Sequence, residues 1–245
     1  RRIAFLLCLL LLMSLVLSGC GGNDTAYDQG SIAFLDNVSN DAQNGYVVLW
    51  QERATTYKRL TSAVNVLAPT WLYVSQNENE TVLLDTTQMG DSVDYAGYVQ
   101  QANKDQIQVW AGVVCQDEAQ TDAVLTQDDV NDAFVTKISE FVQASGVNGV
   151  NLYFPALNSE NRDAFSALVS KVRTALAEGV MLNVCVSFAS GGTAETQSSA
   201  YDYVTLADTC DHLLLMAFEQ YGLFSETAGP ICGYEWLSSN VAKML

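Results

Sequence analysis

The chain has 245 residues, of which 49% are hydrophobic and 16% are charged, and its formal net charge is −17. This length and composition suit one large α/β domain with a sizeable core. An acidic surface repels nucleic acid and anionic lipid, so neither is an expected partner. The acidic residues are spread along the chain, and we attribute them to solubility.

The first twenty residues have the pattern of a bacterial export signal. Arg1 and Arg2 are followed by an apolar stretch over residues 3–17, which is shorter than the ~20 residues of a membrane-spanning helix. It ends in Leu17-Ser18-Gly19-Cys20, the arrangement of a lipobox, whose Cys is acylated and becomes the N-terminus. We therefore predict a lipoprotein signal peptide over 1–20, a lipid anchor on Cys20, and a location on the outer face of a bacterial membrane. An ordinary signal peptide that happens to contain a Cys is the alternative.

Beyond this leader, the predicted elements alternate between strands and helices. Residues 21–44 are small and polar and predict a tether. Apolar runs predict strands at 46–50, 64–74, 107–114, 149–154, 181–188 and 212–218, with a small hairpin strand within 80–87. Helices are predicted after Thr126 and stopping at Gly146, after Ser159 and stopping before Gly179, and at 92–102, 201–207 and 236–245.

Repeated βα units with apolar strands indicate a parallel sheet. Six such units over about 200 residues suit a (β/α)8 barrel of TIM type, which usually has ~250 residues. We predict an α/β barrel over 45–245 that is incomplete in this chain, with about six βα units and a truncated C-terminus. An open barrel of six strands would expose a hydrophobic edge.

Four cysteines lie beyond the leader, and metal or cofactor chemistry is not indicated for them. His212 is the only histidine and no CxxC motif exists, so we expect no metal site and no cofactor. Cys185 lies in an apolar strand, where a buried free thiol is the commoner role. If a disulfide forms, Cys210 with Cys232 is the least implausible pair.

The segment Asn148-Gly-Val-Asn-Leu-Tyr-Phe-Pro155 carries the most information about function. Its alternation places Val150, Leu152 and Phe154 on one face, where they would pack under helices. The other face carries Asn151, Tyr153 and Pro155, which would line the barrel interior and ascend to the C-terminal mouth, where ligands bind.

This segment resembles the signature strand of glycoside hydrolase family 18, Asp-Gly-x-Asp-x-Asp-x-Glu. Asn148 stands at the first Asp, Gly149 keeps the Gly, and Asn151, Tyr153 and Pro155 stand at the second Asp, the third Asp and the Glu. Residues 64–71, 108–111, 201–203, 206–211 and 216–219 resemble further segments of the branch that includes bacterial spore-cortex and peptidoglycan N-acetylglucosaminidases.

The resemblance implies that the family's hydrolytic chemistry is lost. In the family, the Glu protonates the glycosidic oxygen, the neighbouring Asp steadies an oxazolinium formed by the substrate's acetamido group, and a Tyr-Asp pair holds that group. Pro155 and Tyr153 supply neither the proton nor the negative charge, and Phe218 and Glu219 stand at the Tyr-Asp pair. No catalytic residue is therefore expected at these positions, and Glu219 and Glu52 are the candidates for a relocated acid.

Several residues near the predicted strand ends are candidates for ligand binding. Aromatic rings can stack on sugar rings, and polar groups can bind sugar hydroxyls. The candidates are Trp71, Trp110, Asn151, Tyr153, Glu219 and Tyr221. Core packing is the alternative, favoured for Trp110 and equally weighted for Trp71, while Asn151 could be one polar member of a satisfied interior and His212 a structural residue.

Three hypotheses follow for the function. The first is a surface lipoprotein that binds an N-acetylglucosamine-containing glycan, such as peptidoglycan or a chitin-like chain, or acts as a scaffold. The second is an active glycosidase that hydrolyses β-1,4 aminoglycans with relocated acids. The third is a solute-binding lipoprotein, which would have two lobes.

Overall fold

The computed structural model describes residues 46–58, 64–77, 82–90, 92–188, 200–218, 220–222 and 225–244. The predicted signal peptide, Cys20 and the tether lie outside the described residues. The chain divides into two compact units, and the larger comprises Val48–Arg59 and Val64–Leu245. Of the smaller unit, the structure describes Tyr46 and Val47. Among all described residues, no helix has both the length and the apolar character needed to span a bilayer.

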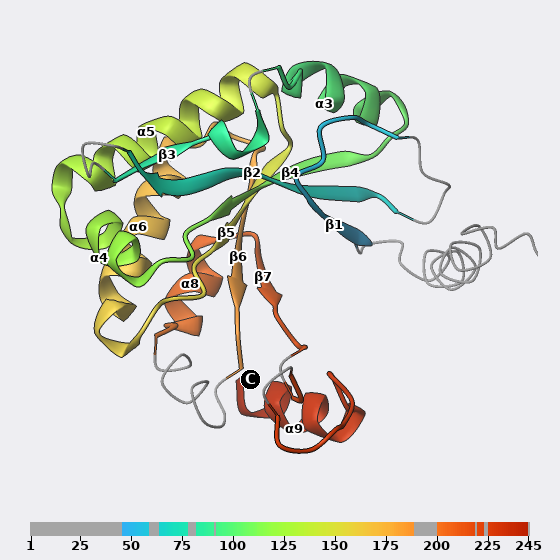
Figure 1. The fold of residues 1–245 in the computed structure, drawn as a ribbon, viewed down its shortest axis with the longest axis vertical. Coiled ribbons are helices and arrows are strands. Elements are labelled where there is room, and N and C mark those ends of the chain that lie inside the picture. The colour runs from blue at the N-terminus through green and yellow to red at the C-terminus, as the bar shows by residue number, and fades with distance from the viewer. Residues whose placement is uncertain are drawn as a thin grey trace, which may run out of the picture. The chain divides into compact units, whose positions relative to one another are not determined.

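The larger unit is built on a curled parallel sheet (Figure 1). Its strand order is β1 (Val48–Glu52), β2 (Val66–Gln76), β4 (Gln108–Val114), β5 (Gly149–Tyr153), β6 (Met181–Val186) and β7 (His212–Leu215). The short strand β3 (Val82–Asp85) runs antiparallel to the end of β2, in the predicted hairpin. The fold class is therefore confirmed: six parallel strands form part of an α/β barrel.

Helices follow the strands, and they cover the outer face of the sheet except for the last one, which lies beyond the ends of the last two strands (Figure 1). They are α3 (Tyr95–Lys104), α4 (Glu118–Thr126), α5 (Asp128–Ser145), α6 (Arg162–Ala175), α8 (Tyr203–Thr209) and α9 (Tyr234–Met244), with short 3-10 turns η1 (Thr87–Met89) and η2 (Ser159–Asn161). Gly146 ends α5 with φ at 70°, as predicted, because a left-handed residue favours glycine.

Two predicted helix caps are wrong. Thr126 is the last residue of α4, which the sequence did not predict, and its hydroxyl donates to the Asp122 carbonyl rather than opening α5. Asn158 caps the turn η2, which runs directly into α6, because its side chain accepts from the amides of Glu160 and Asn161. Helix α6 itself begins after Asn161 without a side-chain cap. Ser159 is instead the first residue of η2. The strand predicted at 212–218 is also shorter, since β7 ends at Leu215.

The two faces of β5 are those predicted from its alternation. Phe154, just past the strand, packs against Phe134 of α5 and Phe165 of α6, with ring centroids 5.8 and 5.2 Å apart. Val150, Leu152 and Phe154 have no exposed surface. This aromatic layer joins the sheet to two helices, so the opposite face of β5 is left for the barrel interior.

Gly149, the first residue of β5, is required by close packing. A Cβ at this position would lie 2.8 Å from Cδ1 of Trp110 and 2.8 Å from Cβ of Met181. Trp110 is itself held from the other side, because its ring stacks on His212 with centroids 5.5 Å apart. The neighbours of Gly149 therefore have little room to move.

We expect Gly149→Ala to lower the free energy of unfolding by about 1–3 kcal/mol, the usual cost of overpacking a filled core. Urea denaturation of both proteins measures the difference. Gly222→Ala is the matched control, since no atom lies within 4 Å of a Cβ built there. Equal stability of the two variants would contradict the close packing at β5.

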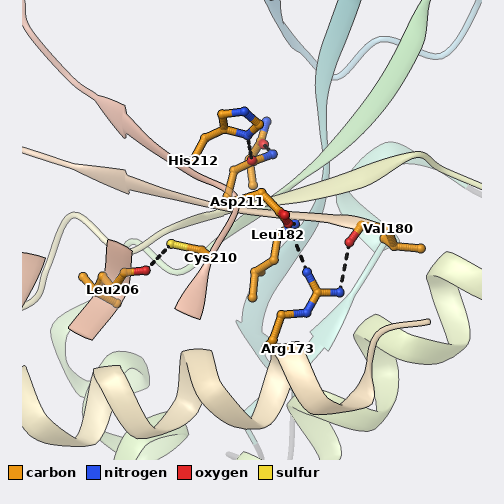
Figure 2. A network of polar contacts seen from close by, with 9 residues as sticks. Arg173, Val180, Leu182, Leu206, Cys210, Asp211 and His212 are labelled. Carbon is orange, nitrogen blue, oxygen red and sulfur yellow. Dashed lines mark hydrogen bonds and ion pairs between the residues drawn. The ribbon is translucent and has the colours of Figure 1, made fainter. Parts of the chain in front are cut away.

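A polar network fixes the start of β7 (Figure 2). The Asp211 carboxylate accepts from the Leu182 amide at 2.7 Å and from the Arg173 guanidinium at 3.0 Å. Arg173 also donates to the Val180 carbonyl at 3.0 Å. The network ties α6 to the beginnings of β6 and β7, and it thereby sets which residues of β7 reach the opposite end of the sheet.

The four cysteines in the described residues are free thiols, so the Cys210–Cys232 disulfide does not form in this structure. The expectation of a buried free thiol at Cys185 is confirmed, and Cys115 is also buried and free. Burial raises the pKa of Cys185 to about 12 and that of Cys115 to about 11. Because the thiolate is the reactive form, both groups are unreactive at neutral pH.

We therefore expect iodoacetamide to modify Cys232, which is exposed, well before Cys115 and Cys185 in the native protein. Both buried thiols have pKa values raised above the ordinary thiol range, so raising the pH from 7 to about 9 leaves them protonated and slow. Peptide mapping by mass spectrometry reads each site separately, and denatured protein gives the fully accessible rates. Equal native rates at Cys185 and Cys232 would show that the core opens readily.

Candidate functional site

A cavity of about 490 Å³ opens at the C-terminal ends of the parallel strands, and we call it the mouth pocket. Every parallel strand except β6 contributes to its wall, either directly or through the residues that follow it. The lining residues are Trp50, Glu52, Thr70, Tyr73, Val114, Gln116, Tyr153, Met216 and Phe218. Barrels of this kind bind ligands at this end of the sheet, because the loops that follow the strands converge there.

A bulge in β2 decides which of its side chains reach the mouth pocket. The pairing of β2 with β4 shifts between Thr70 and Leu72, so Thr70 pairs with Gly112 and Tyr73 pairs with Val114. One extra residue in a strand changes the face of every side chain after it. Thr70 and Tyr73 therefore both face the pocket, although three positions separate them.

Aromatic side chains form much of the pocket wall. Trp50 of β1 meets Tyr153 of β5 edge-to-face, with ring centroids 6.4 Å apart. Trp50 is 37% exposed and Phe218 is 48% exposed, so both rings present surface to a ligand. Tyr73 is buried, and its hydroxyl has no hydrogen-bond partner among the described residues.

Glu52 is the one charged residue among the nine that line the pocket. It ends β1, and its side chain is exposed at the rim. Arg53 follows Glu52 in the chain, and its guanidinium lies 5.8 Å from the centroid of the Tyr73 ring and donates to Gln88 at 3.0 Å. The pocket therefore combines aromatic walls with a single carboxylate.

Below the pocket, three polar side chains cross neighbouring strands of the barrel interior. Asn183 of β6 donates from Nδ2 to Oδ1 of Asn151 on β5 at 2.8 Å. Its own Oδ1 lies 2.8 Å from Nδ1 of His212 on β7, so this ring nitrogen carries the proton. The three residues are paired in strand register, which explains their contact. Asn151 Nδ2 is buried without a partner among the described residues.

The structure brings some of the predicted site residues together and separates others. Tyr153 and Glu52 both line the mouth pocket, as the barrel resemblance led us to expect. Pro155 lies two residues past β5, half-buried, and is not part of the pocket wall. Asn151 lies in the interior beneath the wall and has no exposed surface. Glu219 lies outside the described residues.

Trp71, Trp110 and Tyr221 are not at the pocket. The Trp71 ring is fully buried between the sheet and the helices, and its indole N–H donates to the Ala54 carbonyl at 2.7 Å. The bulge in β2 turns it away from the interior. Trp110 is buried in the interior, stacked on His212, so the favoured expectation of core packing describes its position. Tyr221 packs on Gly229, where its ring leaves no room for a Cβ.

Sequence reasoning missed most of the residues that the structure places at the pocket or beneath it, among them Trp50, Thr70, Tyr73 and Asn183. Trp50 and Tyr73 lay within predicted strands, and their aromatic character was a usable signal. The polar Asn183 in the apolar run 181–186 was a signal of the same kind as Asn151. Within the described ranges, no group of three or more His, Cys, Asp or Glu side chains could hold a metal ion.

The parallel sheet, its covering helices and the pocket at the C-terminal strand ends place this protein in the class of α/β barrels. The model of glycosyl hydrolases family 18 matches residues 45–242, and the chain belongs to this family. The resemblance seen in the signature strand is thereby confirmed at the level of the family.

Known proteins resemble the chain at low identity. It is 23% identical over 150 residues to the uncharacterized glycosylase YvbX of Bacillus subtilis, covering 57% of this chain and 43% of that protein. The chitinase of Chromobacterium violaceum has a TM-score of 0.64 at 19% identity, covering 81% of this chain and 63% of that one. The spore cortex-lytic enzyme SleL of Bacillus cereus has a TM-score of 0.62 at 12% identity, covering 81% and 47%.

The chain spans less than two thirds of each of these three proteins, at 43%, 63% and 47% of their lengths. The structural likenesses therefore establish the fold and not a shared activity.

Proposed function

We propose that this protein is a surface lipoprotein whose family 18 domain binds an N-acetylglucosamine-containing glycan, such as peptidoglycan or a chitin-like chain, and does not cleave it. The observation that carries the proposal is Tyr153 in the wall of the mouth pocket, at the position of a family carboxylate. Its phenol supports stacking on a sugar ring and cannot supply negative charge near neutral pH.

The composition of the pocket supports binding over hydrolysis. A positioned general acid contributes typically 10²–10⁴-fold to such a reaction. The family chemistry implied by the resemblance needs a proton-donating Glu with an Asp beside it, and the nine described lining residues supply one carboxylate, Glu52. The aromatic wall remains, and flat apolar rings are the usual platform for the apolar face of a pyranose.

Fluorescence titration tests binding directly, because Trp50 lines the pocket and is partly exposed. We expect chitooligosaccharides or peptidoglycan fragments to change the tryptophan emission of the protein with a saturable curve. Trp50→Phe should remove most of this signal while calorimetry still detects binding. Absence of binding by both methods would contradict the glycan proposal and leave a scaffold role.

An active glycosidase is the second candidate, and the position of Glu52 on the pocket rim favours it. A reducing-end assay on the same glycans separates the two functions. Turnover that disappears in Glu52→Gln or Glu219→Gln would establish the enzyme and contradict the binding proposal. Persistent inactivity on several aminoglycans supports binding alone. A solute-binding lipoprotein is disfavoured, since its two-lobed form differs from a family 18 barrel sheet.

The proposed anchor at Cys20 has its own test. We expect the protein, expressed in a bacterium with lipoprotein processing, to fractionate with membranes, and Cys20→Ala to shift most of it to the soluble fraction. Two or three acyl chains hold a protein on a bilayer, and their loss leaves only the protein surface. Equal membrane association of both proteins would contradict lipidation at this residue.

A further inference from the structure

We propose that the mouth pocket selects a glycan unit that carries a free ammonium group, such as glucosamine, over the same unit in N-acetylated form. The inference rests on the proposed function and names the sugar chemistry that this site prefers. It follows from the combination of aromatic rings and one carboxylate around a single cavity.

Aromatic rings enclose the cavity from several strands. Trp50 comes from β1, Tyr73 from β2 and Tyr153 from β5, and Phe218 follows β7. The faces of such rings attract cations through their quadrupoles, with Trp the strongest. Rings converging from separate strands surround a bound group in a way that no single stacking platform does.

The charge around the pocket favours the same ligand. Glu52 is the one charged group in the described wall, and none of the nine lining residues is Lys, Arg or His. The formal net charge of −17 adds a long-range field that concentrates cations. An ammonium group gains an ion pair with the carboxylate and a cation–π attraction to the ring faces, whereas a neutral acetamido group gains neither of these charge interactions.

One ring of the pocket already has a cation beside it in the structure. The Arg53 guanidinium lies 5.8 Å from the Tyr73 centroid, and its hydrogen bond to Gln88 holds it there. Arg53 is not part of the pocket wall. The positive charge of Arg53 repels a second cation in the pocket, so its removal should strengthen the binding of an ammonium ligand.

Calorimetric titration with two tetrasaccharides tests the inference. The probes are the β-1,4 tetramer of glucosamine, at a pH where its amino groups are protonated, and the tetramer of N-acetylglucosamine. We expect the glucosamine tetramer to bind roughly 5- to 30-fold more tightly, the sum of a modest ion pair and cation–π contacts. Added salt should weaken its binding and leave that of the N-acetylated tetramer nearly unchanged.

Three variants locate the effect. Glu52→Gln should weaken binding of the glucosamine tetramer about three- to five-fold and leave the N-acetylated tetramer within two-fold, as expected for an exposed ion pair. Arg53→Gln should strengthen binding of the glucosamine tetramer alone. Glu178→Gln is the matched control, because Glu178 is exposed just before β6, at the opposite end of the sheet.

The outcomes separate this inference from the proposed function. Preferential binding of the N-acetylated tetramer, or equal binding of both, would overturn the inference and still support glycan binding. Equal losses in Glu52→Gln and Glu178→Gln would show attraction to the acidic surface as a whole and would also overturn it. Binding of neither tetramer would overturn both statements.

Discussion

Trp71→Ala is expected to lower the free energy of unfolding by about 3–5 kcal/mol, the usual cost of removing a fully buried aromatic side chain. The Trp71 ring contacts Tyr95 and Tyr98 of α3, with centroids 5.0 and 5.1 Å apart. It also lies 6.1 Å from Phe141 of α5, so one side chain joins β2 to two helices. Its removal leaves a cavity that these rings cannot fill.

Denaturant unfolding measures this loss, and Trp71→Phe is the matched control. The phenyl ring keeps most of the packing but not the hydrogen bond to Ala54, so we expect a smaller cost than for alanine. The folded Trp71→Phe protein should bind glycan as the parent does, since Trp71 is not among the residues that line the mouth pocket. A large loss of glycan affinity in this variant, at unchanged stability, would show that Trp71 takes part in ligand binding.

Asn183→Leu is expected to lower the free energy of unfolding by about 2–4 kcal/mol. Asn183 has no exposed surface, and it is the hydrogen-bond partner of both Asn151 and His212. A buried polar atom that loses its partner costs about 1–3 kcal/mol, because water no longer solvates it. In Asn183→Leu, Oδ1 of Asn151 would lose its donor and stay buried without a hydrogen bond.

A double-mutant cycle distinguishes this explanation from a simple packing defect. The double variant Asn151→Leu/Asn183→Leu removes the acceptor oxygen of Asn151 together with its donor. Its loss of unfolding free energy should therefore be smaller than the sum of the losses in the two single variants. Urea denaturation of the four proteins gives the coupling. Strictly additive losses would show that the hydrogen bond between the two amides contributes little to stability.

The sequence was sufficient where a local pattern decides the structure. The alternation over 149–155 placed Phe154 under the helices and Tyr153 toward the interior, and both positions are confirmed. Each depends only on the period of two in a strand. Gly146 ended α5 for an equally local reason, the left-handed backbone that closes a helix.

Local reasoning failed where one element depends on another. Trp71 was a candidate for the mouth because it stands near the end of a predicted strand, with core packing weighted equally. The bulge that turns it away from the interior arises from pairing with β4. Helix α4 was missed because it is short and its buried residues Ala123, Val124 and Leu125 follow one another rather than forming a helical stripe. Its stability comes from packing, which no stretch of sequence displays by itself.

The sequence by itself determined the family, the parallel α/β architecture and the absence of carboxyl groups at positions 153 and 155, which are Tyr and Pro. These follow from residue identity and short-range periodicity. Only the tertiary structure decided that one cavity is lined by Glu52 together with Trp50, Tyr73, Tyr153 and Phe218. It also decided that Asn151, Asn183 and His212 are linked by hydrogen bonds across three strands. The physical reason is strand register: pairing between distant segments sets which side chains are neighbours, and a shift of one residue would exchange the faces.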